Sequence, residues 1–275
     1  RLLGLRRSVD RQNVSVEAQR LSRAMEIDRR ISLEQPIAFV GHQLRLSTAA
    51  QGPRPQVGRF AELEVHAFGR QLPDRPEVGL LDQTEPEKDG SKRWNTDSTL
   101  QPRPPLGILL QSIQLPALCG DTSWASMVAA FDALSPPIQQ TLEGLTAMHD
   151  VRGPLLRAVQ GGHAIQAIDE VIARWPPRSH PVVCRHPETG RRFLYVNSNF
   201  TTRINEVSEA ESDALLHFLF EHVRAPELQV RFRWEEGSVA LWDNRCTQHH
   251  AAADYSERRI MHRVTIAGTW TPSAA

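Results

Sequence analysis

The chain has 275 residues, of which 40% are hydrophobic and 23% are charged, and 32 basic residues balance 32 acidic ones. This length suits one large domain or two small ones with a substantial buried core. A formal net charge of zero excludes a general electrostatic attraction to nucleic acid or to an anionic membrane. No apolar run approaches the roughly 20 residues of a membrane-spanning helix. From the net charge we expect no nucleic-acid partner, and from the charge and the missing apolar run we expect no membrane partner.

Three cysteines, Cys119, Cys184 and Cys246, are far apart and form no CxxC pair. Such a set argues against a disulfide framework or a structural zinc site and fits a reducing compartment. The basic segment 1–7 lacks the apolar core of a secretory signal. We therefore expect a cytoplasmic protein, and eleven histidines direct attention to metal chemistry.

The first part of the chain is predicted to mix a helix, strands and loops. An Arg-rich stretch at 14–30 is typical of a helix, and the apolar run 36–40 suits a buried strand. Segment 82–93 contains no aliphatic residue and is predicted to be a solvated loop. The run 106–115, with prolines on both sides, is predicted to be a strand.

The middle of the chain is predicted to be helical, as an insertion over about 122–176. Three features indicate helices here: small and apolar residues at helical spacing, residues that can serve as N-caps, and prolines in a first turn. The first predicted helix covers 122–134, with Asp121 or Thr122 as its N-cap, and a second one is opened by Pro136 and Pro137. A third lies within 161–175, and a fourth follows the capping box of Ser208 and Glu211.

The last part of the chain alternates apolar and polar residues over 228–234 and 260–269, with a short apolar run at 238–242. A turn-rich, histidine-bearing stretch follows from residue 243. Strands at both ends with helices between them favour an antiparallel sandwich or jelly roll that carries helical insertions. We expect one domain over 1–275.

Three segments concentrate polar residues that an ordinary core would not contain. In 94–97, Asn95 and Asp97 would share one face of an extended strand. In 242–250, an apolar strand leads into a turn that bears His249. In 258–263, Arg259 and Arg263 alternate onto one face, where buried guanidinium groups are costly unless each meets an anion.

These segments resemble the TauD/TfdA family of Fe(II)/2-oxoglutarate-dependent dioxygenases. The matching stretches are 59–63, 94–97, 120–124, 196–203, 242–249 and 259–263. They occur in the family order over about residues 35–270, whereas segment 1–34 matches poorly. The resemblance implies a mostly β fold with helical insertions, namely a double-stranded β-helix of the jelly-roll, cupin-like kind.

The resemblance also implies a reaction and the residues that perform it. Fe(II), 2-oxoglutarate and O2 would hydroxylate a small anionic substrate, taurine or another sulfonate, releasing sulfite, an aldehyde, succinate and CO2. Family members often form homodimers or homotetramers. The implied roles are iron ligand for Asp97 and His249, 2-oxoglutarate binding for Thr122 and Arg259, and substrate binding for His66 and Arg263.

Two positions depart from the family. Asn95 replaces the first histidine ligand, and an amide oxygen is a poorer donor to iron than an imidazole nitrogen. Gly69 replaces a substrate-contacting tyrosine, which opens the pocket to a larger sulfonate or an alkyl sulfate ester. Three alternatives therefore stand beside a sulfonate dioxygenase: an alkyl sulfate ester dioxygenase, an impaired homologue that binds 2-oxoglutarate without turnover, and an active enzyme with an engineered Asn95.

The remaining tryptophans and histidines are predicted to be structural. Trp94, Trp124, Trp234 and Trp242 are expected in the core, and Cys246 as a small buried residue. The histidines predicted to lie on helices or loops, at the surface or in packing contacts, are His149, His163, His180, His186, His217 and His222.

Overall fold

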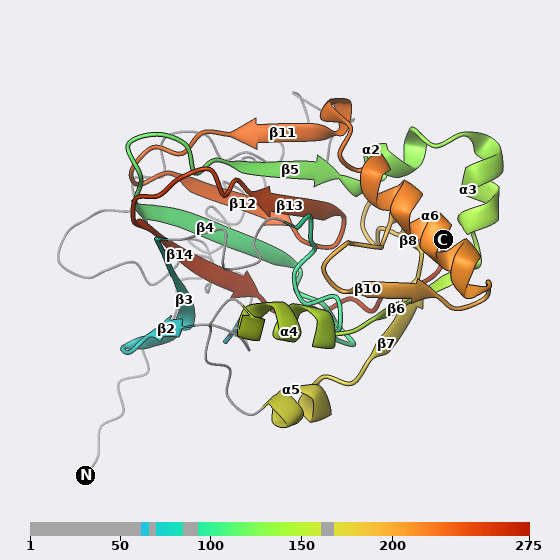
Figure 1. The fold of residues 1–275 in the computed structure, drawn as a ribbon, viewed down its shortest axis with the longest axis horizontal. Helices are drawn as coiled ribbons and strands as arrows, with labels where there is room; N and C mark the ends of the chain where they lie inside the picture. Colours follow the sequence, from blue (N-terminus) through green and yellow to red (C-terminus); the bar gives the residue numbers. More distant parts are fainter. Residues whose placement is uncertain (1–61, 66–69, 85–92, 161–167) are drawn as a thin grey trace, which may run out of the picture. The chain divides into compact units, whose positions relative to one another are not determined.

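A computed structural model describes residues 62–65, 70–84, 93–160 and 168–275 (Figure 1). All of them fall within one structural unit, Glu34–Ala275. The predicted helix at 14–30, the predicted strand at 36–40, His66, Gly69 and His163 lie outside the described residues. The single domain over 1–275 stays a prediction. Among the described helices, none is both long enough and apolar enough to cross a bilayer.

The larger sheet has six antiparallel strands, in the order β12-β4-β14-β3-β2, with β1 also paired to β14. Their bounds are β1 Leu63–Glu64, β2 Arg70–Leu72, β3 Arg75–Gln83, β4 Gly107–Gln114, β12 Val239–Asp243 and β14 Arg259–Ile266. Period-two alternation forms these strands: Ile108 and Leu110 of β4 are buried, while Leu109 between them is partly exposed.

A second, three-stranded sheet faces the first one (Figure 1). It consists of β5 (Thr122–Ser126) between β11 (Gln229–Phe232) and β13 (Thr247–Ala251). Trp124 of β5 packs edge-on against Trp242 of β12, with ring centroids 5.4 Å apart, and shares a buried cluster with Met261 of β14. The two layers therefore enclose one apolar core, and the predicted jelly roll is confirmed.

The remaining elements flank the two layers. The helices are α2 Met127–Asp132, α3 Pro136–Leu142, α4 Arg152–Gln160, α5 Ile168–Arg174 and α6 Glu209–His222, with a 3-10 turn η2 at Pro226–Leu228. The smaller strands are β6 Thr146–His149, β7 Arg178–Pro181 and β10 Thr201–Ile204 in one sheet, and β8 Val183–Arg185 with β9 Arg192–Leu194 in a hairpin. A second core joins α2, α6 and β9 around Phe131, Phe193 and Leu219.

Helix starts follow the predicted capping chemistry in two places. Ser208 and Glu211 form a reciprocal capping box at α6, because the Ser208 hydroxyl accepts from the Glu211 N–H and the Glu211 carboxylate accepts from the Ser208 N–H. Pro136 opens α3, where its missing N–H costs nothing.

The prediction of a helix over 122–134 was wrong in its first five residues. Residues 122–126 form β5, which pairs with β11 on one side and β13 on the other. Ser126, rather than Asp121 or Thr122, caps the helix, and its hydroxyl accepts from the Ala129 N–H. Backbone pairing on both edges of this segment stabilises a strand. The spacing of its small and apolar residues fits a helix as well as a strand, so it does not decide the structure. The insertion over 122–176 is also interrupted by β6.

Two segments predicted as loop or turn lie partly in strands. Residues 82 and 83 belong to β3, because Gln83 pairs with Arg259 and the Asp82 carboxylate accepts two hydrogen bonds from Arg258. The stretch after residue 243 turns only briefly and then continues as β13. The isolated bridge between Asn95 and His249 extends the pairing of β13 beyond its own sheet.

His149 and His180 lie on strands, not on helices or loops as predicted. They are buried on β6 and β7 and form a cluster with Tyr195, with ring centroids 5.3–5.7 Å apart. Their predicted packing role is confirmed. Burial lowers the pKa of His149 to about 3 and that of His180 to about 4, so both imidazoles are neutral at physiological pH.

Candidate metal centre

The candidate metal centre starts from a short backbone pairing between two distant segments. The Asn95 N–H donates to the His249 carbonyl at 3.1 Å, and the His249 N–H donates to the Asn95 carbonyl at 2.9 Å. This pairing brings the 94–97 segment against β13. Alternation along β13 then directs adjacent histidines to opposite faces: His249 lies against Trp242, whereas His250 stacks on Trp94.

Asp97 and His249 lie close together as the resemblance implies. The distance from His249 Nε2 to Asp97 Oδ2 is 3.9 Å, and both side chains are largely buried. Two ligand atoms at this separation can bind one divalent ion after a small adjustment, since metal–ligand distances are about 2 Å. A carboxylate and an imidazole are typical ligands of a first-row transition metal.

The imidazole of His249 is available as a ligand. Burial lowers the pKa of His249, Asp97 opposes this shift, and Arg263 adds to it, so the neutral form is favoured. His249 Nδ1 is buried and has no hydrogen-bond partner among the described residues. A neutral buried imidazole whose Nε2 faces a carboxylate can coordinate a metal ion.

Asn95 lies beside these two residues, but as a weaker donor. Its Nδ2 donates to Asp97 Oδ1 at 3.3 Å, which leaves the amide oxygen as its only ligand atom. The described residues therefore fit a divalent metal through Asp97 and His249, with Asn95 supplying a weak third ligand. Weaker metal binding as a result of Asn95 stays a prediction.

Arg263 approaches the same carboxylate from β14. Its Nη2 lies 3.0 Å from Asp97 Oδ2, which is an ion-pair distance. Arg259 lies on the same inward face of β14, and Met261 between them is fully buried. One strand face therefore presents two cations toward the space between the two sheets.

Arg259 and Thr122, both predicted to bind 2-oxoglutarate, lie next to each other. Arg259 Nη2 lies 3.5 Å from Thr122 Oγ1, and the Trp234 indole N–H donates to the same hydroxyl at 2.9 Å. Arg259 is buried, which lowers its pKa, and within the described ranges no carboxylate lies at ion-pair distance from it. A buried guanidinium of this kind binds an anion such as a carboxylate.

His249 of the candidate metal centre and Thr122, which contacts Arg259, lie on neighbouring strands. Thr122 pairs with Ala251, and Trp124 pairs with His249, so Thr122 and His249 lie two residues apart along the β5–β13 ladder. The structure thus brings Asn95, Asp97, Thr122, His249, Arg259 and Arg263 to one region between the sheets. His66 is outside the described residues, so its predicted substrate contact stays a prediction.

A second group of potential ligands, His186, Asp243 and Cys246, has donor atoms within 4.8 Å of one another. The Asp243 carboxylate is already used by Arg245, through Nε at 2.9 Å and Nη2 at 2.6 Å, and by His186 Nε2 at 3.0 Å. Burial raises the pKa of the Cys246 thiol well above its usual value, so the thiol stays protonated. We interpret this group as a structural ion cluster, and Cys246 is buried as predicted.

Two contributors to the site were not predicted as such. Trp234 was predicted as core packing, yet its indole N–H binds the Thr122 hydroxyl. Asn244 was treated as part of a turn, yet its buried carboxamide binds the Asp97 backbone. The sequence signal that could have revealed Asn244 is its place directly after the apolar run 238–242, where a polar side chain needs hydrogen-bond partners if it is buried.

Comparisons with known proteins identify the family of this chain. A family model described as "Taurine catabolism dioxygenase TauD, TfdA family" matches residues 42–265. A structure titled as a putative alpha-ketoglutarate-dependent taurine dioxygenase from Burkholderia xenovorans has a TM-score of 0.65 and 35% identity, covering 79% of this chain and 74% of that one.

The curated relatives also indicate this family. An alkylsulfatase of Acinetobacter baylyi is 33% identical over 88% of this chain and 76% of its own length. An alpha-ketoglutarate-dependent sulfate ester dioxygenase of Pseudomonas putida is 37% identical over 64% of this chain and 59% of its own length. A sulfonate dioxygenase of Saccharomyces cerevisiae is 33% identical over 82% of this chain, which spans 56% of that protein. The chain belongs to the TauD/TfdA family of 2-oxoglutarate-dependent dioxygenases.

Proposed function

We propose that the chain is an Fe(II)- and 2-oxoglutarate-dependent dioxygenase that acts on a small organic sulfonate or sulfate ester. The observation that carries the proposal is the buried guanidinium of Arg259, which touches Thr122 and forms no ion pair with a carboxylate among the described residues, although Asp121 acts on it from a longer distance. A protein retains such a buried charge where a ligand anion neutralises it. In a 2-oxoglutarate-dependent family, that anion is the distal carboxylate of the co-substrate.

Each side chain has a defined task in this proposal. Asp97 and His249 hold the metal, with the Asn95 amide oxygen as a weak third ligand. Arg259 forms a bidentate pair with the distal carboxylate of 2-oxoglutarate, and Trp234 fixes the orientation of the Thr122 hydroxyl beside it. Bound iron would supply oxidative decarboxylation of 2-oxoglutarate by O2 to succinate and CO2, coupled to substrate hydroxylation.

Arg263 is the proposed contact of the substrate anion. It projects from the same face of β14 as Arg259 and lies beside Asp97, so a sulfonate or sulfate bound to it would place its carbon chain near the metal. Hydroxylation of the carbon next to sulfur, or next to the ester oxygen, gives an unstable adduct. That adduct releases sulfite or sulfate together with an aldehyde.

The sulfate ester alternative is supported by relatives named as an alkylsulfatase and a sulfate ester dioxygenase. The impaired-homologue alternative is supported by Asn95, whose amide lies where the family has an imidazole. We further propose a cytoplasmic protein that forms a homodimer or homotetramer. Its three cysteines form no disulfide, which supports a reducing compartment.

The test measures succinate formation with Fe(II), ascorbate and 2-oxoglutarate against taurine, a longer alkanesulfonate and an alkyl sulfate. We compare the unsubstituted chain with Asn95→His, and use Asn95→Gln as the matched control that keeps an amide. Asn95→His is expected to raise substrate-dependent succinate formation at least about 10-fold, because an imidazole ligand is restored. If neither the chain nor Asn95→His forms succinate with any of these substrates, the proposal is wrong.

A further inference from the structure

Asn244 links the turn after β12 to the segment that carries Asp97. Its side-chain oxygen accepts from the Asp97 N–H at 3.1 Å, and its Nδ2 donates to the Asp97 carbonyl at 3.0 Å and to the Pro105 carbonyl at 3.2 Å. The side chain is fully buried, so each of these bonds forms away from competing water. The Asn244 carboxamide therefore hydrogen-bonds to both the backbone N–H and the backbone carbonyl of Asp97.

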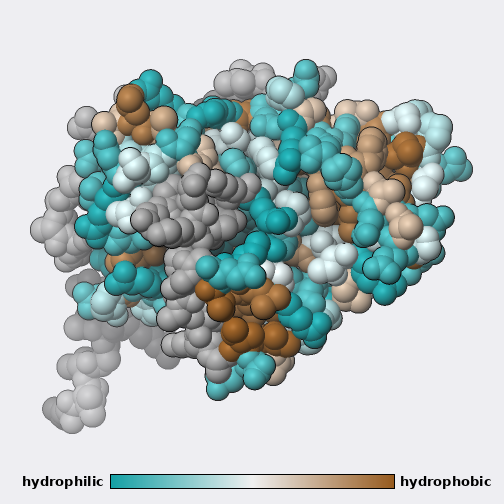
Figure 2. Space-filling view, viewed as in Figure 1, coloured by the Kyte–Doolittle hydropathy of each residue, from teal (hydrophilic) through white to brown (hydrophobic). Residues whose placement is uncertain are grey.

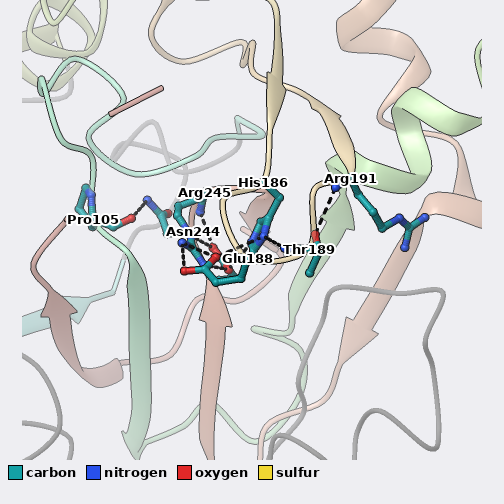
Figure 3. A network of polar contacts seen from close by, with 8 residues as sticks. Pro105, His186, Glu188, Thr189, Arg191, Asn244 and Arg245 are labelled. Atoms are coloured by element: carbon teal, nitrogen blue, oxygen red, sulfur yellow. Dashed lines mark hydrogen bonds and ion pairs between the residues drawn. The ribbon is translucent and has the colours of Figure 1, made fainter. Parts of the chain in front are cut away.

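The backbone around Asn244 is itself held in place. The Asn244 N–H donates to the Leu106 carbonyl at 3.0 Å, just before β4 begins. Figure 3 shows the polar side chains that gather around this turn. Its two neighbours in sequence, Asp243 and Arg245, belong to the ion cluster with His186 described above.

The ion cluster contacts the turn through several ion pairs and hydrogen bonds. Burial acts to raise the pKa of Asp243, yet hydrogen bonds from Arg245 and His186 hold that pKa at about 2. Asp243 also accepts from the backbone N–H of Arg245 at 2.9 Å, which closes the turn around Asn244. Glu188, from the loop after β8, accepts from Arg245 Nη1 at 2.9 Å. Charge-assisted bonds from two chain segments thus restrain the position of Asn244.

The same turn also positions the second metal ligand. It leads directly into β13, on which His249 lies, and the Thr247 carbonyl accepts from Thr96 Oγ1 at 3.0 Å. Asp97 and His249 come from distant parts of the chain, and both are tied to residues 243–247. Their separation of 3.9 Å depends on the geometry of this turn.

We propose that Asn244 is a positioning residue of the metal centre, which holds the Asp97 carboxylate at metal-binding distance from His249. The Asp243–Arg245–His186 cluster holds Asn244 in turn. This inference rests on the part of the proposed function in which Asp97 and His249 bind a divalent cation. It assigns a role to a residue that touches neither the metal nor a substrate.

The test measures Mn(II) affinity by calorimetry and, separately, the free energy of unfolding of the metal-free protein. Asn244→Ala removes all three side-chain bonds. Asn205→Ala is the matched control, because Asn205 Nδ2 donates to Thr146 and Ser179, each at 2.9 Å, in the β10-β6-β7 sheet. Asn244→Ala is expected to weaken Mn(II) binding by about 10–100-fold, and Asn205→Ala by less than about 2-fold, even where both lower stability.

Asn244→Ser provides a second variant, because its short hydroxyl keeps a polar group but cannot span both backbone atoms of Asp97. Folded Asn244→Ala or Asn244→Ser protein with unchanged Mn(II) affinity overturns the positioning role, as does an equal loss in Asn205→Ala. Loss of folding in both Asn244 variants also overturns it, since the role is then purely structural. If the unsubstituted chain itself binds no Mn(II), the metal centre of the proposed function fails instead, and the positioning role with it.

Discussion

Arg263 Nη2 lies 3.0 Å from Asp97 Oδ2, the same carboxylate oxygen that lies 3.9 Å from His249 Nε2. A guanidinium and a divalent metal ion therefore compete for one oxygen. We expect a metal ion bound to Asp97 to release Arg263 for the anion of a substrate. The geometry therefore predicts that the substrate binds after the metal.

Arg263→Gln tests this competition. The substitution removes a cation from the metal site, so we expect Mn(II) to bind about 3–10-fold more tightly in the absence of substrate. Sulfonate binding should weaken by at least about 10-fold, because a charge-assisted bond is lost. Calorimetric titrations of both ligands measure these changes. Arg258→Gln, which breaks only an exposed pair with Asp82, is the control, and weaker Mn(II) binding in Arg263→Gln would refute the competition.

Arg259→Lys tests the 2-oxoglutarate contact. Lysine keeps the charge but cannot make a bidentate pair, so the KM for 2-oxoglutarate is expected to rise by about 10–100-fold. Arg224→Lys is the matched control, because Arg224 is exposed and pairs with Glu221 at the end of α6. Equal KM values for Arg259→Lys and the unsubstituted chain would show that the co-substrate binds elsewhere.

Stability is expected to fall as the pH decreases from 6.5 toward 4. Burial holds the pKa of His149 at about 3 and that of His180 at about 4, whereas both titrate near 6.5 in the unfolded chain. Between these values the unfolded chain binds more protons, so the stabilisation is fully present above pH 6.5 and is lost below it. Urea unfolding at pH 7.5, 6 and 5 measures the slope.

The contribution of the buried pair can be separated from that of other groups. His180→Gln should flatten this pH dependence, because it removes one of the two buried imidazoles. A free energy of unfolding that is the same at pH 7.5 and pH 5 would contradict the assignment of neutral buried imidazoles.

Ser208→Ala is expected to destabilise the protein without affecting the metal centre. The substitution removes the cap of α6 and should lower the free energy of unfolding by about 1 kcal/mol. Thr141→Ala, which removes an exposed hydroxyl bonded to the Pro137 carbonyl in α3, should change it by less than about 0.5 kcal/mol. A change in Mn(II) affinity in Ser208→Ala would mean that α6 is coupled to the site.

The strands with regular alternation were predictable from the sequence. Segments 106–115, 228–234 and 260–269 became β4, β11 and β14, because one face of each lies against the core and the other does not. β5 was not predictable, since its small and apolar residues fit a helical period equally well. Only its partners on both edges, which are distant in sequence, decide between the two structures.

The site was predictable as a set of residues but not as a geometry. The resemblance identified Asp97, His249, Thr122, Arg259 and Arg263, and the structure brings them together. The contact between Arg263 and Asp97 was not predicted, because no local spacing reports on a pair from two strands so far apart in the chain. The same holds for Asn244, whose bonds to Asp97 depend on the packing of a turn.

Calorimetric titration of 2-oxoglutarate, with and without Mn(II), tests the central claim most directly. If Asp97 and His249 hold a metal beside the anion site of Arg259, Mn(II) should tighten 2-oxoglutarate binding by at least about 10-fold, and Asp97→Asn should abolish this gain. A 2-oxoglutarate affinity that depends neither on Mn(II) nor on Asp97 would contradict a shared site.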